Sequence, residues 1–204
     1  MNSTYESDHI NTILGTEFRP CDPEPTDVAL VEQSRVFYSL AQHLLDVSQA
    51  LETVEGADPK RQLYGLLHDA SETYLADVPG MVKDRFVHYR EAEDAIIAAV
   101  WEWSNLGPPE MEADDTDESS KAVPPWKDAD YGVLQIEGDE LLTNFEPDSE
   151  SFDRYSDCVT IKLGDDFAAI RQAFIDRAEA LSDACGGSIH LRAEADLTAL
   201  AKTP

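Results

Sequence analysis

The sequence predicts an all-α fold. Three observations support this class: apolar residues recur at helical spacing in five stretches, helix-end signals flank several of them, and strand-like alternation is confined to 157–163. The chain has 204 residues, of which 42% are hydrophobic, enough to bury one core without disulfide or metal support. We therefore expect a single helical domain.

Three helices are expected in the first half of the chain. The stretch 39–51 begins with Ser39, a residue type that caps helix N-termini, and places its apolar residues along one face. The stretch 63–74 repeats this pattern. The stretch 87–104 is followed at 105–109 by Asn-Leu-Gly-Pro-Pro, a typical helix stop because glycine ends a helix and proline cannot continue it.

Two further helices are expected on the C-terminal side of an acidic insertion. Residues 108–125 are bounded by prolines, acidic and poor in apolar residues, which predicts an exposed or disordered loop. A fourth helix follows this insertion, and a fifth begins near Asp165 and ends at the glycine pair 186–187. We assign residues 1–184 to one domain and residues 185–204 to a C-terminal tail.

The charge balance favours some partners and excludes others. The chain has 42 acidic and 15 basic residues, a formal net charge of −27. Because no basic stripe could neutralise phosphates, nucleic-acid binding is not expected. Self-repulsion of this size destabilises a compact state unless salt screens it, so the composition resembles that of proteins from salt-accumulating hosts or their viruses. The alternative is an acidic surface that imitates nucleic acid and binds a basic partner.

The sequence also predicts the compartment. The three cysteines have no close ligand spacing, as expected of reduced thiols. The N-terminus lacks the basic start and apolar segment of a signal peptide, and no apolar run approaches the roughly 20 residues that span a bilayer. We expect a soluble, cytoplasmic protein with no membrane partner. A homodimer or a higher homo-oligomer is compatible with the sequence.

Histidines and aspartates give the clearest chemical signal. His68 and Asp69 are adjacent on one predicted helix, His43 is on the preceding helix, and Asp130 is near the start of the helix after the insertion. Two adjacent residues cannot complete a metal shell, so other helices must supply ligands. Two imidazoles and two carboxylates suit Mn²⁺, Co²⁺, Mg²⁺, Fe²⁺ or Zn²⁺ better than thiophilic ions. Alternatively, His43 is a core histidine bonded to a backbone carbonyl.

The surrounding residues resemble those of HD-domain metal-dependent phosphohydrolases. The stretches RVFYSLAQHLLDVSQAL, LLHDASETYLADVPGMVK and KDADYGVL keep the order H…HD…D of that family, and the string HDxxExxxxDxPxxxK is the specific part. The similarity is greatest to the small branch of 5′-deoxynucleotidases and phage dATP triphosphohydrolases. It implies a single HD-domain helical bundle and a divalent metal ion. The matching ligands are His43, His68, Asp69 and Asp130, with Asp128 and Asp139 as alternatives for the fourth.

The resemblance also assigns roles in catalysis and substrate binding. Glu72, on the same predicted helix face as the HD pair, matches the carboxylate that positions or deprotonates the attacking water. Asp77 matches an acid near the sugar or the leaving group, unless it only caps a helix end. Lys83 matches a phosphate-binding residue, unless it is an ordinary surface lysine. Arg35 stands in for an arginine that contacts the nucleotide.

The expected function is hydrolysis of a phosphate ester or anhydride in a nucleotide, with a deoxynucleotide favoured. A triphosphohydrolase acting, for example, on dATP is slightly favoured over a 5′-nucleotidase, because residues 18–28 and 74–83 look closer to the phage enzymes. The alternative is a non-catalytic acidic protein that retains the HD scaffold and binds a basic partner.

Overall fold

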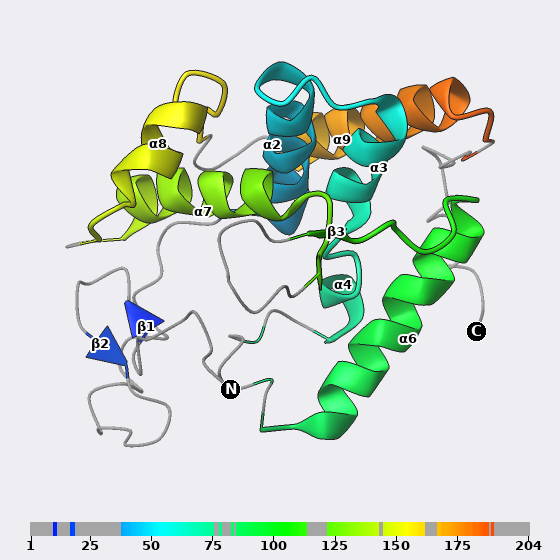
Figure 1. Cartoon of the computed structure of the whole chain (residues 1–204), viewed down its shortest axis with the longest axis horizontal. Helices are drawn as coiled ribbons and strands as arrows, with labels where there is room; N and C mark the ends of the chain where they lie inside the picture. Colours follow the sequence, from blue (N-terminus) through cyan, green and yellow to red (C-terminus); the bar gives the residue numbers. More distant parts are fainter. Residues whose placement is uncertain are drawn as a thin grey trace, which may run out of the picture.

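The computed structural model describes residues 10–11, 17–18, 38–75, 78, 83, 85–113, 122–142, 145–161, 167–187 and 189. Most of them are helical, which confirms the predicted helical class (Figure 1). The helices are α2 (Leu40–Thr53), α3 (Pro59–Leu67), α4 (Glu72–Leu75), α6 (Val87–Trp103), α7 (Lys127–Leu141), α8 (Ser149–Tyr155) and α9 (Phe167–Ala184). The strands form two short antiparallel pairs, β1 (Ile10–Asn11) with β2 (Glu17–Phe18) and β3 (Glu112–Ala113) with β4 (Ala122–Val123).

The core lies where α2 packs against α3, α7 and α9 (Figure 1). Most of the side chains in it are apolar, and Val47, Leu51, Leu63 and Val133 have no exposed surface. Burying a side chain of this kind contributes roughly 1.5–3 kcal/mol. A side chain at Gly65 would overlap Leu51, so glycine at this position allows α3 to approach α2 closely. That approach places the first half of α2 beside the C-terminal end of α3.

Several helix ends occur where the sequence predicts them. Ser39 is the N-cap of α2, and its side chain accepts a hydrogen bond from the backbone N–H of Gln42. After α6 the chain reverses through Asn105, with a φ of 58°, and Gly107, with a φ of 68°. After α9, Gly186 also has a positive φ, of 72°. Glycine adopts such left-handed conformations without steric cost, which explains why these residues end helices.

The predicted continuous helix over 63–74 is wrong. Helix α3 ends at Leu67, a turn covers 68–71, and α4 begins at Glu72. Within the turn, the N–H of Ala70 bonds to the carbonyl three residues back. The imidazole of His68 lies 2.8 Å from the carbonyl of Gly65, an acceptor that a continuing α-helix would use for its next backbone N–H. The helix therefore ends just before the HD pair, and Glu72 does not share one continuous helical face with it.

Two other regions differ from the prediction. Helix α8 lies in an acidic segment with few apolar residues, so periodicity does not reveal it. No strand is present among the described residues 157–161. The insertion 108–125 contains β3 and β4, whose pairing brings its two arms together, and residues 114–121 lie outside the described part of the chain. Among the helices that the structure describes, none has both the length and the apolar character needed to cross a bilayer.

Candidate metal centre

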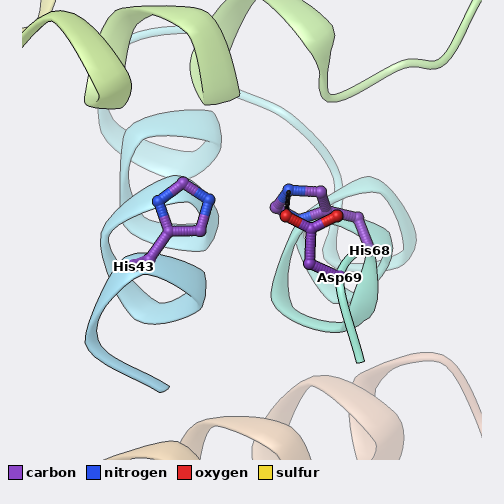
Figure 2. Close-up of side chains that lie close together, drawn as sticks. All are labelled: His43, His68 and Asp69. Carbon is purple, nitrogen blue, oxygen red and sulfur yellow. Dashed lines mark ion pairs between the residues drawn. The ribbon is translucent and has the colours of Figure 1, made fainter. Parts of the chain in front are cut away.

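Three of the four predicted metal ligands lie close together on α2 and at the end of α3. His43 is near the start of α2, His68 is the C-cap residue of α3, and Asp69 is in the following turn. Figure 2 shows the His43 ring on α2 beside the His68–Asp69 pair on the neighbouring segment. Each of these residues offers one ligand atom, and these atoms all lie within 4.8 Å of one another.

Asp130, in the first turn of α7, connects the two imidazoles. Its Oδ1 lies 3.3 Å from Nε2 of His43 and 3.6 Å from Nε2 of His68. The Nε2 atom of His68 is also 3.2 Å from Oδ2 of Asp69. Asp128 and Asp139 are exposed on α7, so the geometry favours Asp130 as the ligand from this helix.

The cluster fits a divalent cation because it contains an unsatisfied donor atom. The Nε2 atom of His68 is buried and has no hydrogen-bond partner of acceptable geometry, although carboxylate oxygens lie close to it. Two ligand atoms that each lie about 2.1 Å from an ion at a right angle are about 3 Å apart, near the spacing between this nitrogen and its neighbouring oxygens. A buried nitrogen of this kind is costly without a partner, and a bound ion would provide one.

The other nitrogen of each imidazole has a hydrogen-bond partner. Nδ1 of His68 lies 2.8 Å from the carbonyl oxygen of Gly65. Nδ1 of His43 lies 2.8 Å from Oε1 of Glu137 on α7. In the neutral form each ring can donate through Nδ1 and keep the Nε2 lone pair directed into the cluster, as metal-bound histidines do. His43 is buried, as the alternative interpretation expects, but its Nδ1 partner is a carboxylate and not a backbone carbonyl.

Electrostatics show what balances the cluster when no ion is bound. Burial alone would lower the pKa of His68, but the carboxylates of Asp69 and Asp130 outweigh it and raise that pKa to about 10. The pKa of His43 is likewise raised despite burial, by Asp130 and Glu137. Burial would raise the pKa of Asp130, but the two imidazoles hold it well below its usual range. Protons on the imidazoles thus occupy the place of a cation.

Glu72 and Lys83 form a second group beside the cluster. The backbone N–H of Glu72 bonds to the carbonyl of Asp69 at 2.9 Å, so this turn links the residue to the HD pair. Nζ of Lys83 lies 3.3 Å from Oε1 of Glu72 and 2.6 Å from Oε1 of Glu93 on α6. All three side chains are at most 15% exposed. Lys83 is therefore paired and half-buried, which makes the interpretation as an ordinary surface lysine wrong.

An aromatic wall closes one side of the cluster. The ring of Trp126, just before α7, lies 5.8 Å from the ring of His68 and stacks at 6.0 Å on Tyr64. The ring of Trp101 on α6 lies 5.9 Å from the ring of Tyr64 and 6.0 Å from the ring of Trp126. This wall is apolar, so it lowers the dielectric around the imidazoles and strengthens the charge interactions within the cluster.

Two predicted site residues lie outside the described part of the chain, and two residues that contact the site were not predicted. Asp77 and Arg35 lie outside the described residues. Glu93 and Glu137 contact Lys83 and His43, respectively, yet belong to no recognised motif. The position of Glu137, seven residues after Asp130 and so about two helical turns further along α7, was the available signal.

Comparison with known proteins adds no assignment. No protein-family model matches the chain, and no curated protein matches its sequence significantly. The geometry of the cluster and the motif resemblance are therefore the grounds on which a function can be proposed.

Proposed function

We propose that this protein is a metal-dependent phosphohydrolase of the HD type that hydrolyses nucleotides. The observation that supports the proposal best is the convergence of His43, His68, Asp69 and Asp130, with the buried Nε2 of His68 lacking a hydrogen-bond partner. A structural histidine would be satisfied at both nitrogens, whereas a ligand keeps one nitrogen for the ion.

The donor set defines the class of cofactor. Two imidazole nitrogens and two carboxylates are suited to Mn²⁺, Co²⁺, Mg²⁺, Fe²⁺ or Zn²⁺. When bound, such an ion supplies Lewis acidity toward a phosphoryl oxygen and lowers the pKa of water. The three cysteines do not contribute to the described cluster, so a site for thiophilic ions is not proposed.

The chain's own residues would orient the substrate and move the proton. Glu72 is held next to the HD pair by its backbone bond to Asp69, and its carboxylate would take the proton of the attacking water. Lys83, now paired with two carboxylates, would instead pair a phosphate oxygen when substrate enters. We further propose Asp77 near the sugar and Arg35 against the nucleotide, by resemblance alone.

The substrate class is a nucleotide, with a deoxynucleotide favoured. A triphosphohydrolase is slightly favoured over a 5′-nucleotidase, as the motif resemblance implies. The charge count argues the other way, because one metal ion and Lys83 neutralise a monophosphate more completely than a triphosphate carrying about four charges. The products therefore have to decide between the two reactions.

A nucleotide panel tests the proposal. Ribo- and deoxynucleotides would be incubated with the protein at high salt with Mn²⁺ or Co²⁺, and the products separated by chromatography. Release of nucleoside plus inorganic triphosphate from dATP identifies a triphosphohydrolase, and release of orthophosphate from dAMP identifies a 5′-nucleotidase. If the metal-loaded protein hydrolyses no nucleotide in the panel, the nucleotide assignment is wrong even when the metal site stands.

A further inference from the structure

Glu137 contacts the ring of His43 from the side opposite the cluster. Its Oε1 lies 2.8 Å from Nδ1 of His43, and the carboxylate is only 11% exposed. The same oxygen accepts a hydrogen bond from the hydroxyl of Tyr38 at 2.8 Å. The hydroxyl oxygen of Tyr38 also lies 3.2 Å from Oδ2 of Asp46, and this carboxylate oxygen accepts a hydrogen bond from Gln42 at 2.8 Å. The contact is therefore one end of a buried network between α2 and α7.

The two histidines of the cluster are held by different means. Nδ1 of His68 faces the carbonyl of Gly65, which belongs to its own helix and moves with it. Nδ1 of His43 faces a carboxylate from another helix, separated by 94 positions in sequence. A backbone carbonyl only orients a ring, whereas a carboxylate also adds negative charge and makes the opposite nitrogen a better donor to a cation.

The direction of the His43 ring follows from this contact. In the neutral ring that a metal ion requires, Nδ1 donates to Glu137 and the lone pair of Nε2 points toward Asp130, which is 3.3 Å away, and toward the ring of His68, whose centroid is 5.5 Å away. If the ring flipped about its Cβ–Cγ bond, Cδ2 would face Glu137 and Cε1 would face Asp130, so both the hydrogen bond and the Nε2 lone pair would be lost to the cluster. The tautomer and orientation that a metal ligand needs are thus the ones that Glu137 selects.

We propose that Glu137 is the positioning residue for His43: it accepts the Nδ1 proton, fixes the tautomer with Nε2 free, and raises the affinity of the cluster for a divalent ion. Tyr38 in turn holds the Glu137 carboxylate. This role rests on the proposed metal site, although the hydrogen bond itself can be tested without a metal.

The test compares four variants by their affinity for Zn²⁺, measured in competition with a chromophoric chelator. Glu137→Ala removes the acceptor, and its affinity should fall roughly 10- to 100-fold, the usual cost of losing such a partner. Glu137→Gln keeps a carbonyl that can accept from Nδ1 but lacks the charge, so it should recover part of that loss. Tyr38→Phe leaves the Nδ1 contact intact and should lose less than Glu137→Ala. Glu140→Ala, at an exposed position on the same helix, should bind like the wild type.

Nitrogen-15 NMR spectra of the histidine rings report which ring nitrogen is protonated and which is coordinated. A purely structural role of Glu137 would not change this assignment. In the Zn²⁺-loaded wild type, His43 should have a protonated Nδ1 and a coordinated Nε2. In the metal-free protein, Glu137→Gln should shift the His43 ring resonances and leave those of His68 unchanged. This spectrum also covers the case in which Glu137→Ala fails to fold.

Two outcomes would overturn the role of Glu137: equal Zn²⁺ affinity in a folded Glu137→Ala variant, or a proton on Nε2 of His43 in the loaded protein. If instead the wild type binds no divalent metal, the proposed function fails. The metal-free spectra of the wild type and Glu137→Gln then decide whether Glu137 positions the ring.

Discussion

At the residue scale, some side chains of the metal cluster can be predicted from the sequence, whereas the side chains that contact them from other helices cannot. The adjacent His68 and Asp69 stand out as a motif, and helical phase with the resemblance adds His43 and Asp130. The structure brings these four together. Glu137 could not be assigned in the same way, because its contact with His43 spans 94 positions and results from the packing of α2 on α7. Periodicity places Glu137 two turns after Asp130 on α7, but it does not show which residue of another helix Glu137 meets.

Replacing Glu72 by Gln should separate catalysis from metal binding. The amide is isosteric with the carboxylate but cannot take a proton from water, so kcat should fall roughly 10²- to 10⁴-fold. Metal content should not change, because Glu72 is not among the proposed ligands. Steady-state kinetics measures kcat, and metal analysis of the same sample measures the metal content. Glu91→Gln, which changes an exposed carboxylate, is the control. Wild-type turnover in the Glu72 variant would show that its role is structural.

Metal affinity should rise with pH. In the metal-free cluster, carboxylates raise the pKa of His43 and His68, the latter to about 10, so both rings hold protons near neutral pH. An ion must displace these protons to reach Nε2, and each displaced proton makes the apparent affinity increase up to about tenfold per pH unit below the pKa. Chelator competition between about pH 6 and pH 8, with calorimetry in buffers of different ionisation enthalpy, measures this release. A flat affinity profile would contradict the protonated state of the rings.

At the scale of elements, the sequence predicts the long helices better than the breaks and the short helices. The starts and ends of α2 and α6 agree closely with the prediction, because a Ser cap and a glycine-containing stop identify them. The interruption between α3 and α4 was not predictable from periodicity, since apolar residues continue in phase through it. At this interruption the His68 ring lies 2.8 Å from the Gly65 carbonyl, an acceptor that a continuing helix would use for its backbone, and such local side-chain contacts compete with helical hydrogen bonds. The site is located at this interruption.

At the scale of the whole molecule, the net charge of −27 is the dominant feature. Burial, opposed by hydrogen bonds from Gln42 and Tyr38, raises the pKa of Asp46 to about 6, so keeping this carboxylate charged carries a desolvation cost. Most of the acids, however, are solvated, and their repulsion is long-ranged and sensitive to ionic strength. The composition therefore favours an environment of high salt.

The melting temperature should fall steeply when salt is removed. Between about 2 M and about 0.1 M salt the screening length lengthens severalfold, so self-repulsion destabilises the folded state increasingly. Thermal denaturation followed by circular dichroism measures the effect. A neutral osmolyte such as sucrose is the control, because it strengthens burial without screening charge. Equal melting temperatures at the two salt concentrations would contradict adaptation to high salt.

The central claim, that the four convergent side chains hold a divalent ion, is tested most directly by metal stoichiometry. The wild type, His68→Ala, Asp69→Ala and the control His88→Ala would be loaded with Mn²⁺ or Zn²⁺, desalted and analysed by mass spectrometry. His88 is a suitable control because its side chain is 99% exposed on α6. We predict one equivalent of metal in the wild type and His88→Ala, and almost none in the other two. Stoichiometric metal in both His68→Ala and Asp69→Ala would contradict the account.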